Sequence, residues 1–322
     1  GQHRTGKVRC CTQFLPQPCF MYYPILRGKQ FELIALRELA SYVGSDVIRP
    51  VIEPVRDNIA QLIKTVELLS KFEIVPLIII NPAIGDFSNG ADGLFERIAS
   101  SVKFVPCVKV KSTEDLSLLG RLGLSLSDSA VFIEGGIDKA LLEMLQEASC
   151  VLVNKDRAHS GAVSRLKNVV LFGDFFEKKS RNADYKDKSF YSSLHTEWRT
   201  YNNAIGFGDY TILSEEYSES GGPAYVVTVH LSYIDNDEFD AMYVRHFSSF
   251  NDDSPANPGG KFKSALESVS NYIEENRGVF FETRGLQELL SLRGAPFPGL
   301  GQVKKYSMKH HIETTCEFVR GE

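Results

Sequence analysis

Eight polar residues lie at the ends of apolar runs that recur along this chain of 322 residues. Carboxylates beside lysines in a partly dry cleft shift one another's pKa values, which suits proton transfer or the binding of an anion. Acid–base catalysis requires such groups within hydrogen-bond distance of one substrate atom. For each residue, the alternative is a strand-ending residue that caps the next helix. The catalytic candidates are Glu53, Glu134, Lys109, Lys111, Asp174 and Asp209.

Four further residues are candidates for holding an anion or substrate. Arg27 and Lys29 flank Gly28 just before a predicted helix, where a basic loop and free backbone amides can bind phosphate or carboxylate. A solvated turn is the alternative for this segment. Asn81 and Asn154 end two of the apolar runs and could bind the same ligand.

The apolar runs themselves predict strands that are buried on both faces. Residues 74–82, IVPLIIINP, are the clearest case, because a continuous β-branched run of this kind is typical of a parallel sheet covered by helices. A helical pattern follows each run, as in residues 31–43 after the first. The predicted strands are 21–26, 48–55, 74–82, 105–111, 130–133, 150–154, 169–172 and 204–207.

Eight alternating strand–helix units predict a closed (β/α)8 barrel of the TIM type. An open doubly wound sheet is the alternative, although no glycine-rich dinucleotide motif follows the first strand. In a barrel, the carboxyl ends of the strands form the functional rim, so the polar residues listed above are expected to share one mouth.

The chain after the eighth strand departs from the barrel pattern. Residues 224–234 and 239–247 alternate in polarity around an acidic turn, which predicts a β-hairpin. A loop at 251–260 and helices at 261–275 and 286–292 follow. One helical stretch is also predicted near 191–201, within a polar segment. We therefore expect one domain over residues 21–322, with a hairpin and loop inserted at 224–260.

The first twenty residues are basic, contain three of the six cysteines and show neither helical nor strand periodicity. We interpret residues 1–20 as an upstream extension or as sequence added for expression, with Met21 as the natural start. A basic arm that binds a partner is the alternative. The cysteines show no metal-type or redox spacing, and the pattern fits a reducing, cytoplasmic location better than a disulfide scaffold.

Composition and motifs exclude several classes of function. The net charge of −5 gives no general basic field, so nucleic acid is not an expected partner unless local basic residues gather. No run approaches the length of a membrane span. Adjacent histidines at 310–311 lack further ligands, so no metal is predicted, and no cofactor motif is present. The basic residues that would have to form a nucleic-acid patch are Lys178, Lys179, Arg181, Lys304, Lys305 and Lys309.

Seven short segments resemble the beta-protein family, named after the beta protein of a phage-satellite gene cassette and including bacterial relatives with "sce" labels. The resemblance begins at residue 21 and extends nearly to the end of the chain. It implies a place in mobile elements and phage-defence loci, beside nucleases or toxins, and implies no catalytic residue. The segments are MYYPILRGKQFELIALREL (21–39), IEPV (52–55), IIINP (78–82), FGDY (207–210), VRHFSS (244–249), KFKSAL (261–266) and HHIE (310–313).

Two functions are therefore expected. The first is a barrel scaffold in a bacterial phage-defence or toxin-control module, which binds a neighbouring defence or toxin protein and a nucleotide-like anion. The alternative is a barrel hydrolase that acts on a small substrate bearing phosphate or carboxylate. In the hydrolase, Glu53 or Glu134 would be the general base, while Lys109, Lys111 and Arg27 would hold the anion.

Overall fold

The computed structural model describes residues 21–219, 221–222 and 224–321, so the interpretation of residues 1–20 lies outside the described part. Eight parallel strands close into a barrel, as the sequence predicted, and the last strand pairs with the first. This closure excludes the open doubly wound sheet. The strands, in barrel order, are β1 (Met21–Leu26), β2 (Val51–Ile52), β3 (Leu77–Ile79), β4 (Val105–Val110), β5 (Ala130–Ile133), β6 (Cys150–Asn154), β7 (Val169–Gly173) and β9 (Ala204–Asp209).

Prolines keep two of the barrel strands short. Pro50 and Pro54 flank β2, while Pro76 and Pro82 stand on either side of β3. Proline has no amide hydrogen to donate to a neighbouring strand, so it is confined to the margins of a sheet. Regular pairing is therefore shorter than the predicted ranges 48–55 and 74–82.

Alternate residues of each strand face opposite sides of the barrel wall. One buried cluster fills the interior and includes Tyr23, Ile25 and Phe132. A larger cluster lies between the wall and the helices and includes Tyr22 and Phe207. This two-residue period decides which strand-end side chains reach the mouth.

Short helices cover most of the barrel's outside. The helical patterns after each strand form these helices where an apolar face can pack on the wall, and α1 and α2 are the longest of the first six. The first six helices are α1 (Gln30–Leu39), α2 (Ala60–Lys71), α3 (Leu94–Ala99), α4 (Ser117–Arg121), α5 (Lys139–Leu145) and α6 (Ser160–Val163).

A three-stranded antiparallel sheet stands beside the barrel. The predicted hairpin is confirmed as β10 (Thr228–Asp235) and β11 (Ala241–Ser248). Its third strand, β8 (Lys188–Ser192), comes from the connection between β7 and β9 and was not predicted. The helix expected near 191–201 begins only after β8, as α7 (Leu194–Glu197) and a short 3-10 turn.

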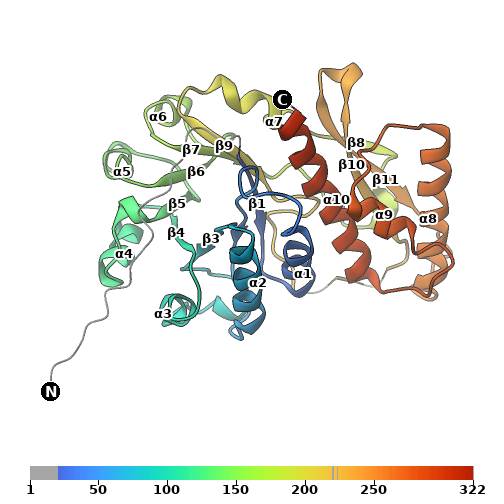
Figure 1. The fold of residues 1–322 in the computed structure, drawn as a ribbon, viewed down its shortest axis with the longest axis horizontal. Helices are drawn as coiled ribbons and strands as arrows, with labels where there is room; N and C mark the ends of the chain where they lie inside the picture. Colours follow the sequence, from blue (N-terminus) through green and yellow to red (C-terminus); the bar gives the residue numbers. More distant parts are fainter. Residues whose placement is uncertain (1–20, 220, 223, 322) are drawn as a thin grey trace.

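Helices α8 (Pro258–Glu275) and α9 (Arg284–Leu290) contribute to a separate apolar core with one face of this side sheet. The last helix, α10 (Leu300–Gly321), lies between the barrel and the side sheet (Figure 1). Met308 and Ile312 of α10 belong to the barrel's outer core, while Val303 belongs to the side-sheet core. Among the described residues, no helix is long and apolar enough to cross a membrane.

Candidate functional site

Four charged side chains from four strand ends form a continuous chain of ion pairs at the barrel mouth. Arg27, just after β1, contacts the carboxylate of Glu53, just after β2. Lys109 of β4 lies 2.9 Å from the other oxygen of Glu53 and 2.7 Å from Glu134, just after β5. Each follows the interior residues of its strand by the two-residue period, so all four point inward. The structure thus brings together Glu53, Lys109 and Glu134, as the sequence predicted, and adds Arg27 to them.

These ion pairs are largely buried, so each charge depends on its partners to offset the loss of hydration. Glu53 is fully buried, and Arg27 and Lys109 are nearly so. Burial disfavours the charged form of Lys109, but the two carboxylates outweigh this effect and raise its pKa. The guanidinium of Arg27 also stacks 5.0 Å from the ring centre of Tyr210. Removing either partner from such a pair leaves an uncompensated buried charge.

Lys111 and the two asparagines have other surroundings. The Lys111 side chain is 76% exposed and its ammonium lies 3.9 Å from Glu134, so it stands at the outer rim. The Asn81 amide exchanges hydrogen bonds of 2.8 and 2.9 Å with the backbone of Lys109, which ties the end of β3 to β4. Asn154 accepts a hydrogen bond from the amide of Asp156 in a local turn. Both asparagines therefore serve the backbone in this structure.

The N-terminus of α1, where an anion was expected, holds a carboxylate of the chain itself. Glu32 is buried and accepts a hydrogen bond from the backbone amide of Arg27. Burial raises the pKa of Glu32, although this amide and the nearby cations oppose the effect. Gly28, in the loop between β1 and α1, has a φ of +60°, and a Cβ there would lie 3.2 Å from the backbone carbonyl oxygen of Glu53. Glycine thus lets this loop approach the backbone at the end of β2 closely.

Asp174 lies at the end of β7, on the mouth side. Its carboxylate accepts a 3.0 Å hydrogen bond from the hydroxyl of Ser214. Burial raises the pKa of Asp174 despite its hydrogen bonds. No described ion pair joins it to the chain that contains Glu53, so it stands apart from that network.

The expectation that Asp209 would lie at the mouth is not met. Asp209 shares a strand face with Phe207, which points outward, and accepts a 2.7 Å hydrogen bond from the Tyr22 hydroxyl. Its oxygen also lies 3.3 Å from His311 of α10. Burial opposes the charged form, but His311 and the hydrogen-bond donors outweigh it and lower the pKa of Asp209. Asp209 therefore fastens α10 to the barrel wall.

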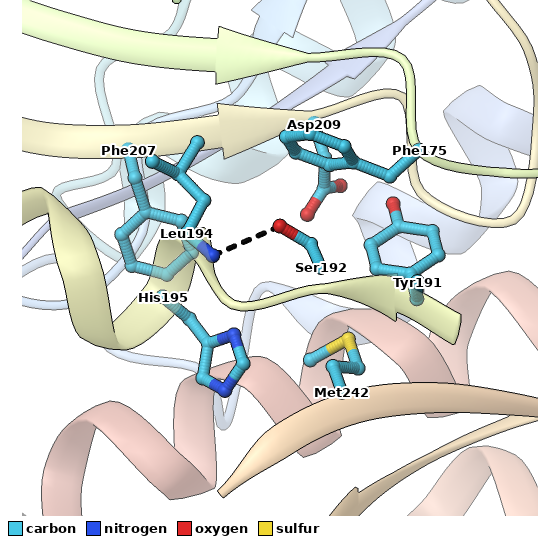
Figure 2. A pocket seen from close by; sticks show the side chains of 8 residues that line it. All are labelled: Phe175, Tyr191, Ser192, Leu194, His195, Phe207, Asp209 and Met242. Carbon is cyan, nitrogen blue, oxygen red and sulfur yellow. Dashed lines mark hydrogen bonds between the residues drawn. The ribbon is translucent and has the colours of Figure 1, made fainter. Parts of the chain in front are cut away.

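The surroundings of Asp209 leave no room for a substrate. Figure 2 shows its carboxylate directed toward Ser192 and Tyr191, beside a cavity of about 10 Å³. That volume is about the size of one water molecule. Neither of the adjacent histidines reaches the mouth, since His311 bonds Ser232 and His310 bonds Thr283 and the Ser232 carbonyl.

A far larger cavity, of about 1250 Å³, opens between the barrel loops and the side sheet. We call it the groove. The loops after β1, β2, β7 and β9 form one wall, and β10 and the start of α10 form the other. Seven basic but only four acidic side chains line it, in a chain whose net charge is −5. The basic residues are Arg27, Lys29, Arg56, Lys178, Lys179, Arg181 and Lys304; the acidic ones are Glu32, Glu216, Glu219 and Asp253.

Lys304 differs from the other basic residues of the groove, because no ion pair or hydrogen bond of its side chain is recorded within the described residues. Lys304 is exposed as a residue and lines the groove, whose walls partly desolvate its charge. This desolvation, with repulsion from Lys29 and Lys178, lowers the pKa of Lys304, although Glu32 opposes the shift. The attraction of an anion bound beside Lys304 would offset both the desolvation and the repulsion.

The basic patch that nucleic-acid binding would require is divided between two regions. Lys178 and Lys304 line the groove. Lys305 and Lys309 lie in another place, buried and paired with Glu38 at 2.8 and 2.9 Å. Within the described ranges, no group of three or more histidine, cysteine or acidic residues is arranged to hold a metal ion.

Comparison with protein-family models, with curated proteins and with solved structures finds no match to this chain. The resemblance to the beta-protein family therefore stays a prediction. Fold and site geometry alone support the functional argument that follows.

Proposed function

We propose that the chain is a cytosolic barrel protein of a bacterial phage-defence or toxin-control module, which binds a partner protein and a phosphate-bearing, nucleotide-like anion. The observation that carries the anion is the positively charged groove beside the barrel mouth. Pockets for small molecules generally occupy about 300–1000 Å³, so the groove has room for a nucleotide.

Binding of ATP, measured by calorimetry at low salt, tests the anion site. A charge-assisted hydrogen bond contributes about 1.5–3 kcal/mol, so Lys304→Ala is expected to weaken ATP binding by roughly 10- to 100-fold. Lys263→Ala is the matched control, because Lys263 is an exposed lysine of α8 outside the groove. Absence of ATP binding to the unmodified protein at millimolar concentration would contradict the proposal, as would equal losses in the two variants.

The module and the partner protein rest on the family resemblance rather than on the site. The test is a pull-down from native cells, with and without phage infection. Recovery of the product of a neighbouring gene is the expected result. If neither condition recovers one, the proposed module is wrong even where ATP binding is measured.

A hydrolase is the second candidate, because Lys109 bridges two carboxylates at the centre of the mouth. Glu134, whose side chain is 28% exposed, is the carboxylate that a substrate can reach, whereas Glu53 is enclosed. Hydrolysis of a panel of phosphate esters and carboxylic esters, lost in Glu134→Gln but kept in Lys263→Ala, would support it. No turnover of any panel member would eliminate it.

A further inference from the structure

An acidic segment runs along part of the barrel rim and contacts five basic residues there. We call residues 214–219, with the sequence SEEYSE, the acidic strap. It follows β9 and begins at the β7 side, where Ser214 donates a hydrogen bond to Asp174. It ends at the β2 side, where Glu219 forms an ion pair with Arg56. The strap thus links the β7 side of the rim to the β2 side, past β9 and β1, which lie between them in the closed barrel.

Each part of the strap bonds a different cation. Glu215 receives two hydrogen bonds from Arg157 through its carboxylate and another from Arg27 through its carbonyl oxygen. Glu216 lies 2.9 Å from the ammonium of Lys178. The ammonium of Lys29 donates to the carbonyl of Ser218 and stands 4.8 Å from the ring centre of Tyr217. Five basic residues, from the loops after β1, β2, β6 and β7, therefore contact this short segment.

Four of these five cations also line the groove. Arg27, Lys29, Arg56 and Lys178 all line it, and the strap supplies part of the wall through Glu216 and Glu219. The strap's carboxylates consequently stand where the negative groups of a bound anion would be neutralised. A ligand and the strap need the same positive charges, so they compete.

The strap is held in a way that permits exchange. The two strap carboxylates that pair with groove cations are exposed, with 73% of the Glu216 and 54% of the Glu219 side chain accessible to solvent. Exposed ion pairs stabilise a structure only weakly and are screened by salt. None of the six strap residues is fully buried, and Tyr217 is its one large apolar side chain. A segment with few apolar contacts opens at low free-energy cost.

We propose that the acidic strap competes with the ligand for the cations of the groove, and yields them to an anion with two or more phosphate groups. This inference rests on the proposed anion site and specifies its ligand: a polyphosphate rather than a single phosphate group. Several charges are required because the strap itself presents two carboxylates, Glu216 and Glu219, to two different cations of the groove. One phosphate could replace only part of that set.

The test compares the affinity of inorganic tripolyphosphate for two triple variants, measured by calorimetry. The strap variant is Glu215→Gln/Glu216→Gln/Glu219→Gln. The control is Glu143→Gln/Glu147→Gln/Glu267→Gln, which changes the net charge equally at exposed helical or near-helical positions away from the groove. We expect the strap variant to bind tripolyphosphate about tenfold more tightly than the control variant. Without its carboxylates, the strap no longer occupies the cations and no longer reduces the apparent affinity.

Amide hydrogen exchange gives a second readout on the unmodified protein. Tripolyphosphate should accelerate exchange in residues 214–219 and leave the barrel strands unchanged. Equal affinities of the two triple variants, or strap amides that exchange more slowly on binding, would overturn the competitor role. In that case, if Lys304→Ala still weakens tripolyphosphate binding, the proposed anion site is supported and only the competitor role is wrong. If no variant binds tripolyphosphate or ATP, the anion site fails and the competitor role fails with it.

Discussion

Replacing Glu53 with glutamine tests the chain of ion pairs at the barrel mouth. The fully buried carboxylate contacts both Arg27 and Lys109. After the substitution, Lys109 keeps Glu134, but Arg27 loses its only recorded carboxylate partner in the described residues. Breaking a buried pair by removing one partner generally costs about 3–5 kcal/mol, because the remaining charge stays desolvated. We expect the free energy of unfolding to fall by that amount.

The same loss should be visible in thermal unfolding. An unfolding entropy of about 2.1 cal/mol/K per residue, over roughly 300 ordered residues, converts 1 kcal/mol into about 1.6 °C. The melting temperature of Glu53→Gln should therefore fall by about 5–8 °C. Urea unfolding followed by circular dichroism supplies the free energy, and calorimetry supplies the temperature.

Two comparisons make the result specific to the buried charge. Lys111→Ala removes an exposed partner of Glu134 and should change stability by only about 0–1 kcal/mol. Adding Arg27→Met to Glu53→Gln removes the stranded cation and should restore part of the loss. If Glu53→Gln is no less stable than Lys111→Ala, the ion-pair chain does not carry the stability assigned to it here.

Three further substitutions test other parts of the structure. Burial lowers the pKa of His310 to about 4, below the ordinary value of about 6.5, so the unfolded chain takes up the proton first and stability falls as pH falls between these values. The free energy of unfolding is expected to be about 2 kcal/mol lower at pH 5 for this reason. Urea unfolding of His310→Gln should not show this decrease, and a variant with the same pH dependence as the unmodified protein would contradict the assignment. Asp209→Ala leaves the Tyr22 hydroxyl and two other donors without an acceptor and should cost about 1–3 kcal/mol in urea unfolding, whereas Asp209→Asn, which keeps an acceptor oxygen, should cost less. Gly28→Ala should lower the melting temperature more than Gly123→Ala, because both positions have positive φ but only Gly28 faces a close carbonyl; equal shifts would refute the close approach.

The barrel was predictable because its strands are buried on both faces. Such strands are apolar throughout, and each is followed by a helical pattern, so the period of the sequence carries the topology. The meeting of Glu53, Lys109 and Glu134 followed from the rule that parallel strands end at one mouth. These residues are local to strand ends, and local signals were sufficient to place them.

The error at Asp209 came from using the end of an apolar run as the criterion instead of the face of the strand. Along β9 the interior positions are Gly206, Gly208 and the following Tyr210, so Asp209 must point outward. The two-residue period contained that information. Glycines at the interior positions obscured it, because they leave no apolar side chain to mark the inward face.

Other features depend on contacts between distant segments and had no local signal. β8 has the sequence KSFYS, with two exposed residues, and becomes a strand because β11 supplies the pairing. Lys304 appeared only as one of several lysines until α10 placed it beside the groove. The acidic strap showed neither helical nor strand period, and its significance comes from the five cations that surround it.

The position of α10 has a consequence for synthesis on the ribosome. The outer face of β1 packs against α10, yet roughly 280 residues separate the starts of these two elements. At about 5–20 residues per second, that face waits on the order of 15–60 s for its cover. Nascent chains are therefore expected to present Tyr22 and its apolar neighbours to chaperones for much of translation.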